Sequence, residues 1–502
     1  MIYDAISIFE NVDFGVKLLV AFLALLVGLW FLVRRRSLYH VPGPTVTMLT
    51  DWWILWQTFM DRRDRVIDSL HAKYGPVVRL GPHEVVISDP AYLKQVYVGN
   101  FDKSDFYSLL GSYDTANMFS SLTKEAHASK RRVVHQLYSK VTVTAPHVEA
   151  AMRELVDRTA VYYEKAATTH EPIDVLKLFR SMAMDIITAF QYGSANGTDF
   201  IRNGKERDLV QEHIEVLSSG WFVVSYLPKL AMLYTPKHIL KSLMFVEQWA
   251  LDLLAGCGKT EESVANKLRK GGFTEKQTQS ETLDHVLAGQ ETSAMTQTYM
   301  LWNLTKYPEV VTKLRKELET VCKTDVLTPS ESLPPFKVLD KLPYLAAVLQ
   351  ETLRLFAPAA GTQARIVPPG GMWYTPSSPS YGPKNMKVFI PEGTTVSLQA
   401  RTVHRDPGVF DDPEKFDPDR WINSTPEKMH AMNKSFFAFG AGVRMCVGMN
   451  LAMLTMKLNI SHIFSHYTVK VGGSTTDETM TMLERFPIRP KTNDCFLIFE
   501  KV

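Results

Sequence analysis

The chain has 502 residues, a length that allows about three domains or one unusually large one at roughly 150 residues per domain. Apolar residues make up 45% and charged residues 22%, which excludes global disorder, collagen-like repetition and a long coiled coil. With 56 basic and 53 acidic residues the net charge is +3. The protein as a whole therefore has no strong positive electrostatic potential that would attract nucleic acid.

The first long apolar segment is residues 14–33, in which Lys17 is the only charged residue. About 20 helical residues at roughly 1.5 Å each span the roughly 30 Å hydrocarbon core of a bilayer. Trp30 lies near one end, where a membrane interface would be. The pattern predicts one transmembrane anchor, and no later stretch of similar length is free of charges.

The charges around this segment orient the predicted anchor. Three arginines at positions 34–36 follow it directly, and basic flanks stay on the cytosolic side of a membrane. Residues 1–13 are then a short lumenal N-terminus, and the rest of the chain is cytosolic. A cleaved signal peptide and a buried core helix are the alternatives. The first would need a basic start, whereas residues 1–13 carry only acidic charges.

Residues 34–45 combine the basic cluster with Pro42-Gly43-Pro44, which fixes an extended turn and predicts a hinge. Residues 46–502 are predicted to form one large, mainly helical domain with minor β structure, because no internal repeat and no long linker divides them. It is expected to begin with a helix over 61–74 and a small N-terminal sheet from strands at 76–81 and 84–88. Mostly helices follow from about 146 to 355, and strand patterns return only after 368. Residues 368–383 are expected to form a surface loop.

A glycine-rich turn around Cys446 is the most informative segment of the chain. It reads Phe439-Gly440-Ala441-Gly442-Val443-Arg444-Met445-Cys446-Val447-Gly448 and precedes an apolar helix. Small residues let backbone N–H groups approach the sulfur, and a helix N-terminus favours negative charge, so the pattern predicts a thiolate that ligates a metal. Phe439 and Arg444 suit a large flat ligand that carries carboxylates, as haem does. A buried structural cysteine is the alternative.

Three weaker patterns accompany this turn. Residues 283–305 form a long apolar helical pattern that contains Ala288-Gly289-Gln290-Glu291-Thr292, where small residues leave room for a ligand and a threonine hydroxyl can bend the helix. Glu351 and Arg354 stand three residues apart on a predicted helix, which by itself indicates only a surface pair. The run His127-Ala128-Ser129-Lys130-Arg131-Arg132 opens another helix, and a solvated basic face is its simplest interpretation.

Taken together, these segments resemble the cytochromes P-450. The haem-binding loop of that family is F-x-x-G-x-R-x-C-x-G, and every fixed position is filled between Phe439 and Gly448. Glu351-Thr352-Leu353-Arg354 is similar to the family's E-x-x-R, and residues 416–421 are similar to the later segment whose arginine, here Arg420, completes that salt-bridged group. Residues 288–292 are similar to the oxygen-binding helix. The resemblance covers nearly the whole chain and implies the cytochrome P-450 fold.

The resemblance also implies a role for each matching residue. Cys446 is the axial ligand of the iron of haem b, Arg444 contacts a haem propionate, and Phe439 and Gly440 shape the pocket around the sulfur. Thr292 and Glu291 organise proton delivery to dioxygen. Glu351, Arg354 and Arg420 are structural and hold the core beneath the haem.

Two departures from the family's usual pattern qualify this assignment. His127 stands where most members have tryptophan, but its N–H can still donate to a propionate, so His127, Arg131 and a further arginine, Arg365, are expected haem contacts. The stretch 371–387 is longer than the hairpin expected at that point. The substrate pocket is expected to include Tyr107, Phe119, Ala288, Gly289, Ala360 and Phe486.

By this resemblance the protein is a haem-thiolate monooxygenase that inserts one oxygen atom of O2 into a lipophilic small molecule. The chain contains no flavin or nicotinamide motif, so electrons come from NADPH through a separate cytochrome P-450 reductase, with cytochrome b5 as a further donor. The C-terminal half is similar to filamentous-fungal members, which implies a terpenoid or polyketide-derived secondary metabolite. The microsomal type implies the membrane of the endoplasmic reticulum. No nucleic-acid partner is expected.

Three other functions stay open at this point. The same fold could rearrange or dehydrate an already oxidised substrate without reductase. A second alternative is a haem-binding protein without turnover. The third is a membrane interaction protein without haem, in which Cys446 is structural.

Overall fold

The computed structural model describes residues 18–19, 22–23, 27–28, 38–99, 101–227, 231, 234–258, 263–326 and 328–502. The predicted lumenal residues 1–13 lie outside these ranges, as does all of the predicted anchor 14–33 apart from six residues. Within the described residues, no helix combines the length and the apolarity needed to cross a bilayer. The prediction of an anchor therefore stays a prediction.

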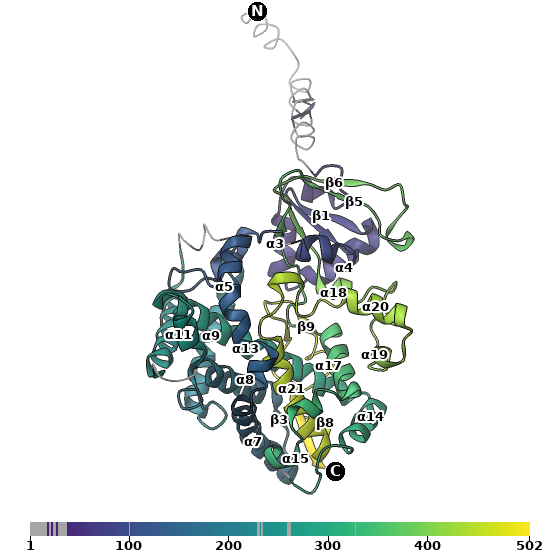
Figure 1. Cartoon of the computed structure of the whole chain (residues 1–502). Helices are drawn as coiled ribbons and strands as arrows, with labels where there is room; N and C mark the ends of the chain where they lie inside the picture. Colours follow the sequence, from purple (N-terminus) through teal and green to yellow (C-terminus); the bar gives the residue numbers. More distant parts are fainter. Residues whose placement is uncertain are drawn as a thin grey trace, which may run out of the picture.

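A four-stranded sheet forms one end of the molecule, opposite the C-terminus (Figure 1). Its strands follow the order β1 (Val77–Gly81), β2 (Glu84–Ile87), β7 (Thr395–Ser397) and β4 (Arg365–Ile366). The first two pair antiparallel, with Val77 opposite Ile87, and confirm the two strands expected from the sequence. The sheet packs against η1 (Thr45–Met48) and α4 (Arg63–Tyr74), and α3 (Trp52–Phe59) contacts both of these helices. The predicted helix over 61–74 corresponds to α4.

Helices make up most of the remaining described chain, as predicted. They are η2 (Lys94–Val98), η3 (Asp105–Leu110), α5 (Lys124–Leu137), α6 (Lys140–Val143), α7 (Pro146–Thr169), α8 (Val175–Tyr192), α9 (Gly204–Tyr226), α11 (Lys237–Gly256), α12 (Val264–Lys270), α13 (Glu275–Leu304), α14 (Pro308–Leu318), α15 (Pro329–Ser332), α16 (Phe336–Leu339), α17 (Pro343–Leu355), η4 (Pro379–Tyr381), α18 (Ala400–Val403), α19 (Arg420–Asn423), α20 (Pro426–Ser435), η5 (Gly442–Arg444) and α21 (Met449–His466). Three small sheets accompany them: β3 (Ile173–Asp174) with β11 (Phe496–Lys501) and β8 (Tyr467–Val471), β9 (Met482–Leu483) with β10 (Arg489–Pro490), and β5 (Met372–Tyr374) with β6 (Val388–Ile390).

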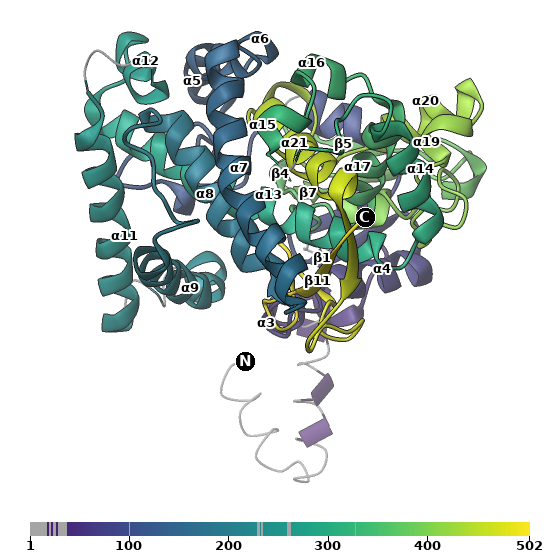
Figure 2. The same cartoon turned by 90° about the horizontal axis from the view of Figure 1, so that it is seen from below.

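The long helix α13 runs through the middle of the helical part, between α8 on one side and α17 and α21 on the other (Figures 1 and 2). It begins at a capping box in which the side chains of Thr274 and Gln277 each accept a backbone N–H of the other residue. From Ala294 to Leu304 every residue is buried, as expected of a helix enclosed on all sides. The rest of the molecule is therefore arranged around α13.

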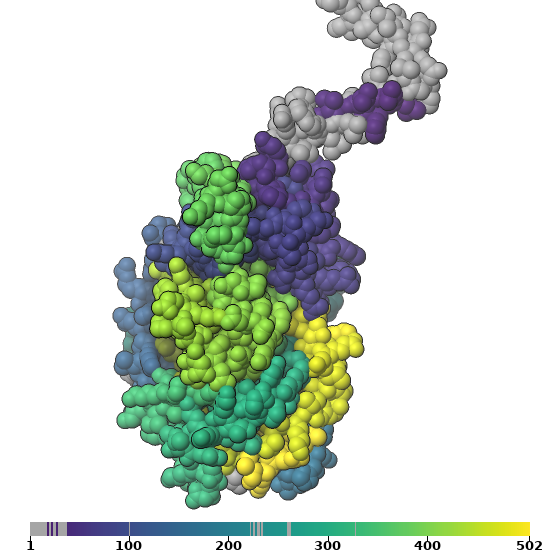
Figure 3. Space-filling model, turned by 90° about the vertical axis from the view of Figure 1, so that its right-hand side faces the viewer, coloured from purple at the N-terminus to yellow at the C-terminus, as the bar shows by residue number. Residues whose placement is uncertain are grey.

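The structure corrects two sequence expectations about β structure. Residues 368–383 are not only a surface loop, because they contain β5, whose Met372 and Tyr374 are buried and which pairs with β6. Between β5 and β6, the Ser377 hydroxyl and N–H donate to the Asp89 carboxylate. This hairpin projects beside the N-terminal part of the domain (Figure 3). Strands also occur before residue 368, in β3 and β4.

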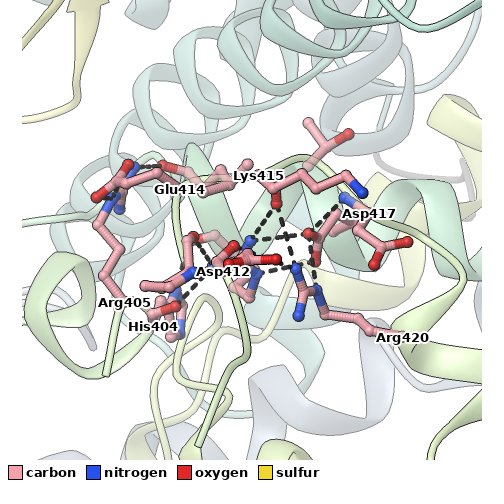
Figure 4. A network of polar contacts seen from close by, with 12 residues as sticks. His404, Arg405, Asp412, Glu414, Lys415, Asp417 and Arg420 are labelled. Atoms are coloured by element: carbon pink, nitrogen blue, oxygen red, sulfur yellow. Dashed lines mark hydrogen bonds and ion pairs between the residues drawn. The ribbon is translucent and has the colours of Figure 1, made fainter. Parts of the chain in front are cut away.

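The carboxylate of Glu351 is fully buried in α17 and lies at the centre of a polar network. Arg354 donates to both of its oxygens at 2.8 Å, and Arg420 Nε donates at 3.1 Å. Figure 4 shows this network around Asp417 and Arg420. The indole N–H of Trp421 and the backbone N–H of Asp417 donate at 2.9 Å. The sequence pattern alone favoured a surface pair, but the structure confirms the buried group that the resemblance implied.

The same network extends to the segment that precedes Cys446. Arg354 donates to the backbone oxygen of His404 at 2.8 Å, and His404 Nδ1 lies 2.9 Å from the Arg354 carbonyl. Burial lowers the pKa of His404 to about 3, so the ring is neutral. Its Nδ1 then donates to Arg354, and its Nε2 accepts the N–H of Phe437 at 2.7 Å. Glu351 is thus connected to the loop through Arg354 and His404.

Replacing Arg354 by methionine is expected to destabilise the protein by about 3–5 kcal/mol, because Glu351 would remain buried without its main partner. The measurement is the midpoint of thermal unfolding, together with the yield of folded protein. Arg202→Met is the matched control, since Arg202 forms an exposed pair with Asp199 at the same spacing of three residues and such pairs contribute about 1 kcal/mol or less. Equal midpoints for the two variants would contradict a structural role for the network.

Candidate haem site

The turn around Cys446 has a backbone that only glycine fits at one position. Gly442 has φ +70°, and a Cβ there would lie 2.5 Å from the carbonyl oxygen of Tyr97. The N–H of Cys446 donates to the carbonyl of Phe439 at 2.8 Å, which closes the turn. The helix α21 begins at Met449, so its N-terminus faces the cysteine. This places Cys446 where the sequence predicted it, between a glycine-rich turn and a helix start.

Among the four cysteines, Cys446 alone has an exposed side chain. Burial nevertheless raises the pKa of its thiol above the usual value, although the N–H groups of Gly448 and Met449 and the charge of Arg131 act in the opposite direction. A side chain that is accessible yet surrounded by protein faces an internal space. Without a metal, the surroundings of Cys446 therefore favour the protonated thiol over the thiolate that the sequence predicts. A bound metal ion deprotonates a coordinating thiol.

Five basic side chains gather on the Cys446 side of the domain. They are Lys103, His127, Arg131, Arg365 and Arg444, and we call them the basic cluster. Burial, followed by the charges of the other four, lowers the pKa of His127 to about 3. Burial and the charge of Arg365 lower the pKa of Arg444 to about 10. Like charges gathered at a buried place require an anionic partner.

The contacts of the basic cluster fit a haem with two propionates. Arg444 donates to the backbone oxygens of Ser121 and Leu122 at 2.8 and 2.7 Å, while its Nε is buried and has no partner among the described residues. Arg131 donates to the carbonyl of Met445 at 2.8 Å, next to the cysteine. A flat ligand with one acidic edge would meet the sulfur and the basic cluster together. Four of the five residues were predicted from the sequence.

Lys103 is the member of the basic cluster that sequence reasoning missed. It is 5% exposed, and its ammonium lies 3.7 Å from the ring centre of Phe119 and 4.2 Å from that of Tyr107. Burial lowers the pKa of Lys103, and the charges of Arg365 and Arg444 lower it further. A lone lysine in a polar segment carries no sequence signal, because its burial depends on aromatic rings brought together by the fold.

In α13, the two residues expected to handle protons have different partners. The hydroxyl of Thr292 donates to the carbonyl of Ala288 at 2.8 Å. Glu291 forms an ion pair with Arg180 of α8, whose Nε donates to Oε2 at 2.8 Å. Burial acts to lower the pKa of Arg180, but the charge of Glu291 raises it above the usual value. Glu291 is therefore held by Arg180, and its role in proton delivery stays a prediction.

The small residue Gly289 lies against the neighbouring helix α8. A Cβ at Gly289 would lie 3.0 Å from Cγ1 of Ile187 in α8, so its small size allows the two helices to pack closely. The expectation that Ala288 and Gly289 leave room for a ligand stays a prediction. Neither Ala288 nor Gly289 lines the pocket described next.

A pocket opens between α3, η3, α9, the turn after α17 and the segment after β9. Three predicted substrate residues, Tyr107, Ala360 and Phe486, line it. Phe119 stands behind them, with its ring centre 5.5 Å from that of Tyr107 and 6.1 Å from that of Phe486. The remaining lining includes further aromatic rings and three charged residues: Phe59, Phe106, Phe222, Tyr226, Asp61, Glu484 and Arg485.

Comparison with known proteins identifies the family. The profile of the family Cytochrome P450 matches residues 42–495, and the chain belongs to this family. It is 29% identical to cytochrome P450 monooxygenase tazI of Aspergillus terreus, over 95% of this chain and 97% of the relative. It is 26% identical to cytochrome P450 monooxygenase stcB of Emericella nidulans, over 89% and 86% of the two chains. N-acetyltryptophan 6-hydroxylase ivoC of the same fungus is 26% identical over 93% and 94%.

The protein is accordingly a haem-thiolate monooxygenase, and the alternative without haem is wrong. Haem held by a thiolate supplies the activation of O2. The residues that would hold this group are Cys446 at the iron and the basic cluster at the acidic edge, and the central helix would offer the hydroxyl of Thr292. The network around Glu351 holds the turn that carries the cysteine.

Proposed function

We propose that this monooxygenase inserts one oxygen atom of O2 into a lipophilic small molecule of secondary metabolism, terpenoid or polyketide-derived, with haem b as its cofactor. The lining of the pocket carries this proposal, because most of its large side chains are aromatic and such a surface binds apolar ligands. The relatives support it: several are fungal monooxygenases, and the name of one states the hydroxylation of N-acetyltryptophan.

We infer that electrons arrive from NADPH through a separate cytochrome P-450 reductase, with cytochrome b5 as a second donor. The family implies a reductase in general. Two basic residues of α5, Lys130 and Arg132, are candidates for contact with the donor, and of these Arg132 is exposed. Lys130 instead donates to the Ser121 hydroxyl at 2.8 Å, which leaves Arg132 as the better candidate for contact with an acidic donor.

We propose that residues 14–33 anchor the protein in the membrane of the endoplasmic reticulum, with membrane lipid as a further partner. The described apolar residues of this segment, Leu18, Leu19, Phe22, Leu23 and Val27, are 50–57% exposed. On α3, Trp52, Trp56 and Phe59 recur at helical spacing and are 57–66% exposed. Exposed tryptophans of this kind suit a membrane interface.

The triple variant Phe22→Asp, Leu23→Asp, Val27→Asp is expected to be released from membranes. Each charge near the middle of a spanning helix raises the free energy of membrane insertion by about 2.5–3.5 kcal/mol. The measurement is the fraction of full-length protein that stays with membranes after alkaline carbonate extraction. Val141→Asp is the control, since Val141 is 82% exposed on the catalytic domain. A wild-type protein that is extracted as readily as the triple variant would contradict the anchor.

Replacing Thr292 by alanine is expected to uncouple the reaction, because the hydroxyl on the central helix would no longer guide protons. Product formed per NADPH consumed should fall by roughly tenfold or more, while hydrogen peroxide rises. Both are measured with reductase and substrate present. Thr298→Ala is the matched control, since Thr298 also donates to the carbonyl four residues before it but is buried among neighbouring helices. Unchanged product formation in the Thr292 variant, without need for reductase, would favour an isomerase or dehydratase instead.

A further inference from the structure

The pocket contains one acidic side chain that has no counter-ion of its own. Glu484 follows β9 and lines the pocket opposite Gly361 of the turn after α17. A Cβ at Gly361 would lie 1.7 Å from Oε1 of Glu484, so the carboxyl group rests directly on the glycine backbone. The other oxygen, Oε2, is buried and has no hydrogen-bond partner among the described residues.

The charged groups that face Glu484 are already paired with other residues. In α4, Arg63 Nη2 is bound to Glu84 at 2.5 Å, while Arg63 Nε is buried without a hydrogen-bond partner among the described residues. In α18, Arg401 Nε lies 2.8 Å from Asp68 and 3.6 Å from Asp64.

Within the pocket lining itself, Arg485 pairs with Asp61 at 2.7 Å. Tyr226 of α9 also faces Glu484 and adds no positive charge. Among the residues that line the pocket, Glu484 is therefore the one with a buried side-chain oxygen that lacks a hydrogen-bond partner within the described part of the chain.

The protonation of Glu484 follows from these surroundings. The pKa of Glu484 is raised to about 8. Burial is the main cause and the charge of Asp64 adds to it, whereas Arg63, the N–H of Asp64 and Arg401 act to lower the pKa. Near neutral pH the group is thus mostly a neutral carboxylic acid. A neutral acid has an O–H to donate, and an unpaired donor at a buried place is costly.

We propose that Glu484 binds an oxygen atom of the substrate and selects ligands that carry a carbonyl group at this end of the pocket. The inference rests on the proposed function and narrows its substrate class to an apolar ring system with an acceptor oxygen. Aromatic rings of Phe106, Phe222 and Tyr226 contact the apolar body, and Glu484 fixes its orientation. Gly361 is part of this device, because any larger residue would push the carboxyl group away.

The test uses the full-length holoenzyme and a pair of probes of the same shape, 2-acetylnaphthalene and 2-isopropenylnaphthalene, in which a CH2 group replaces the carbonyl oxygen. Affinities are measured by calorimetric titration. Wild type is expected to prefer the ketone by about fivefold to tenfold, the worth of one hydrogen bond. The preference should persist at pH 6.5 and disappear by pH 9.5, because Glu484 loses its proton as the pH rises through about 8.

The variants separate a neutral donor from a charged group. Glu484→Gln should keep the preference, because the amide N–H also donates, whereas Glu484→Leu should lose it. The exposed Glu478, which pairs with Lys491, supplies the control Glu478→Leu, and this variant should behave like wild type. A third probe, 1-(2-naphthyl)ethylamine, is protonated at neutral pH and tests an ion pair.

Equal binding of the two naphthalene probes by wild type would overturn the proposal, and so would a ketone preference that survives Glu484→Leu. Preference for the amine that is lost in Glu484→Gln would also overturn it, in favour of an ionised carboxylate. Should the leucine variant fail to fold, the pH series and the glutamine variant still decide. The carbon monoxide difference spectrum of each preparation, recorded in parallel, distinguishes failure of this inference from failure of the haem assignment.

Discussion

The buried carboxylate of Glu351 is the interaction on which the site depends. A charge without exposure to water is tolerated only when its oxygens are fully hydrogen-bonded, and here Arg354, Arg420, Trp421 and the N–H of Asp417 meet that need. These donors come from α17 and from the segment that ends in α19. The carboxylate therefore fixes two distant parts of the chain relative to one another.

From this point a short chain of contacts leads to the cysteine. Arg354 and His404 bind one another's backbone, and His404 accepts the N–H of Phe437, two residues before the turn begins. The turn is closed by the bond from Cys446 to Phe439 and by the close approach of Gly442 to Tyr97. A structural ion pair thus sets the position of the residue that is expected to bind the cofactor.

The basic cluster links the stability of the fold to the binding of an anionic cofactor. Burial of five basic groups lowers the stability of the protein unless an anion neutralises them. The lowered pKa values of His127 and Arg444 reflect this cost. A dicarboxylate such as haem, bound at the basic cluster, would relieve this cost and stabilise the folded state.

The sequence predicted the site well where a motif has a fixed spacing along the chain. The Cys446 turn, the Glu351 group and the central helix are such motifs, and α4, β1 and β2 follow from local periodicity and turns. Other features depend on what the fold brings together. Lys103 is buried within the basic cluster because Phe119 and Tyr107 cover it. Glu484 depends on Gly361, which is remote in sequence, and Gly289 meets Ile187 of another helix.

The most direct test of the central claim is the carbon monoxide difference spectrum of the reduced full-length protein, recorded for wild type and for Cys446→His. A strongly red-shifted Soret band in wild type that is absent in the variant is the predicted result, because only thiolate ligation by Cys446 produces it. A well-folded wild-type protein without this band, or a variant that retains it, would contradict the assignment of Cys446 as the haem ligand.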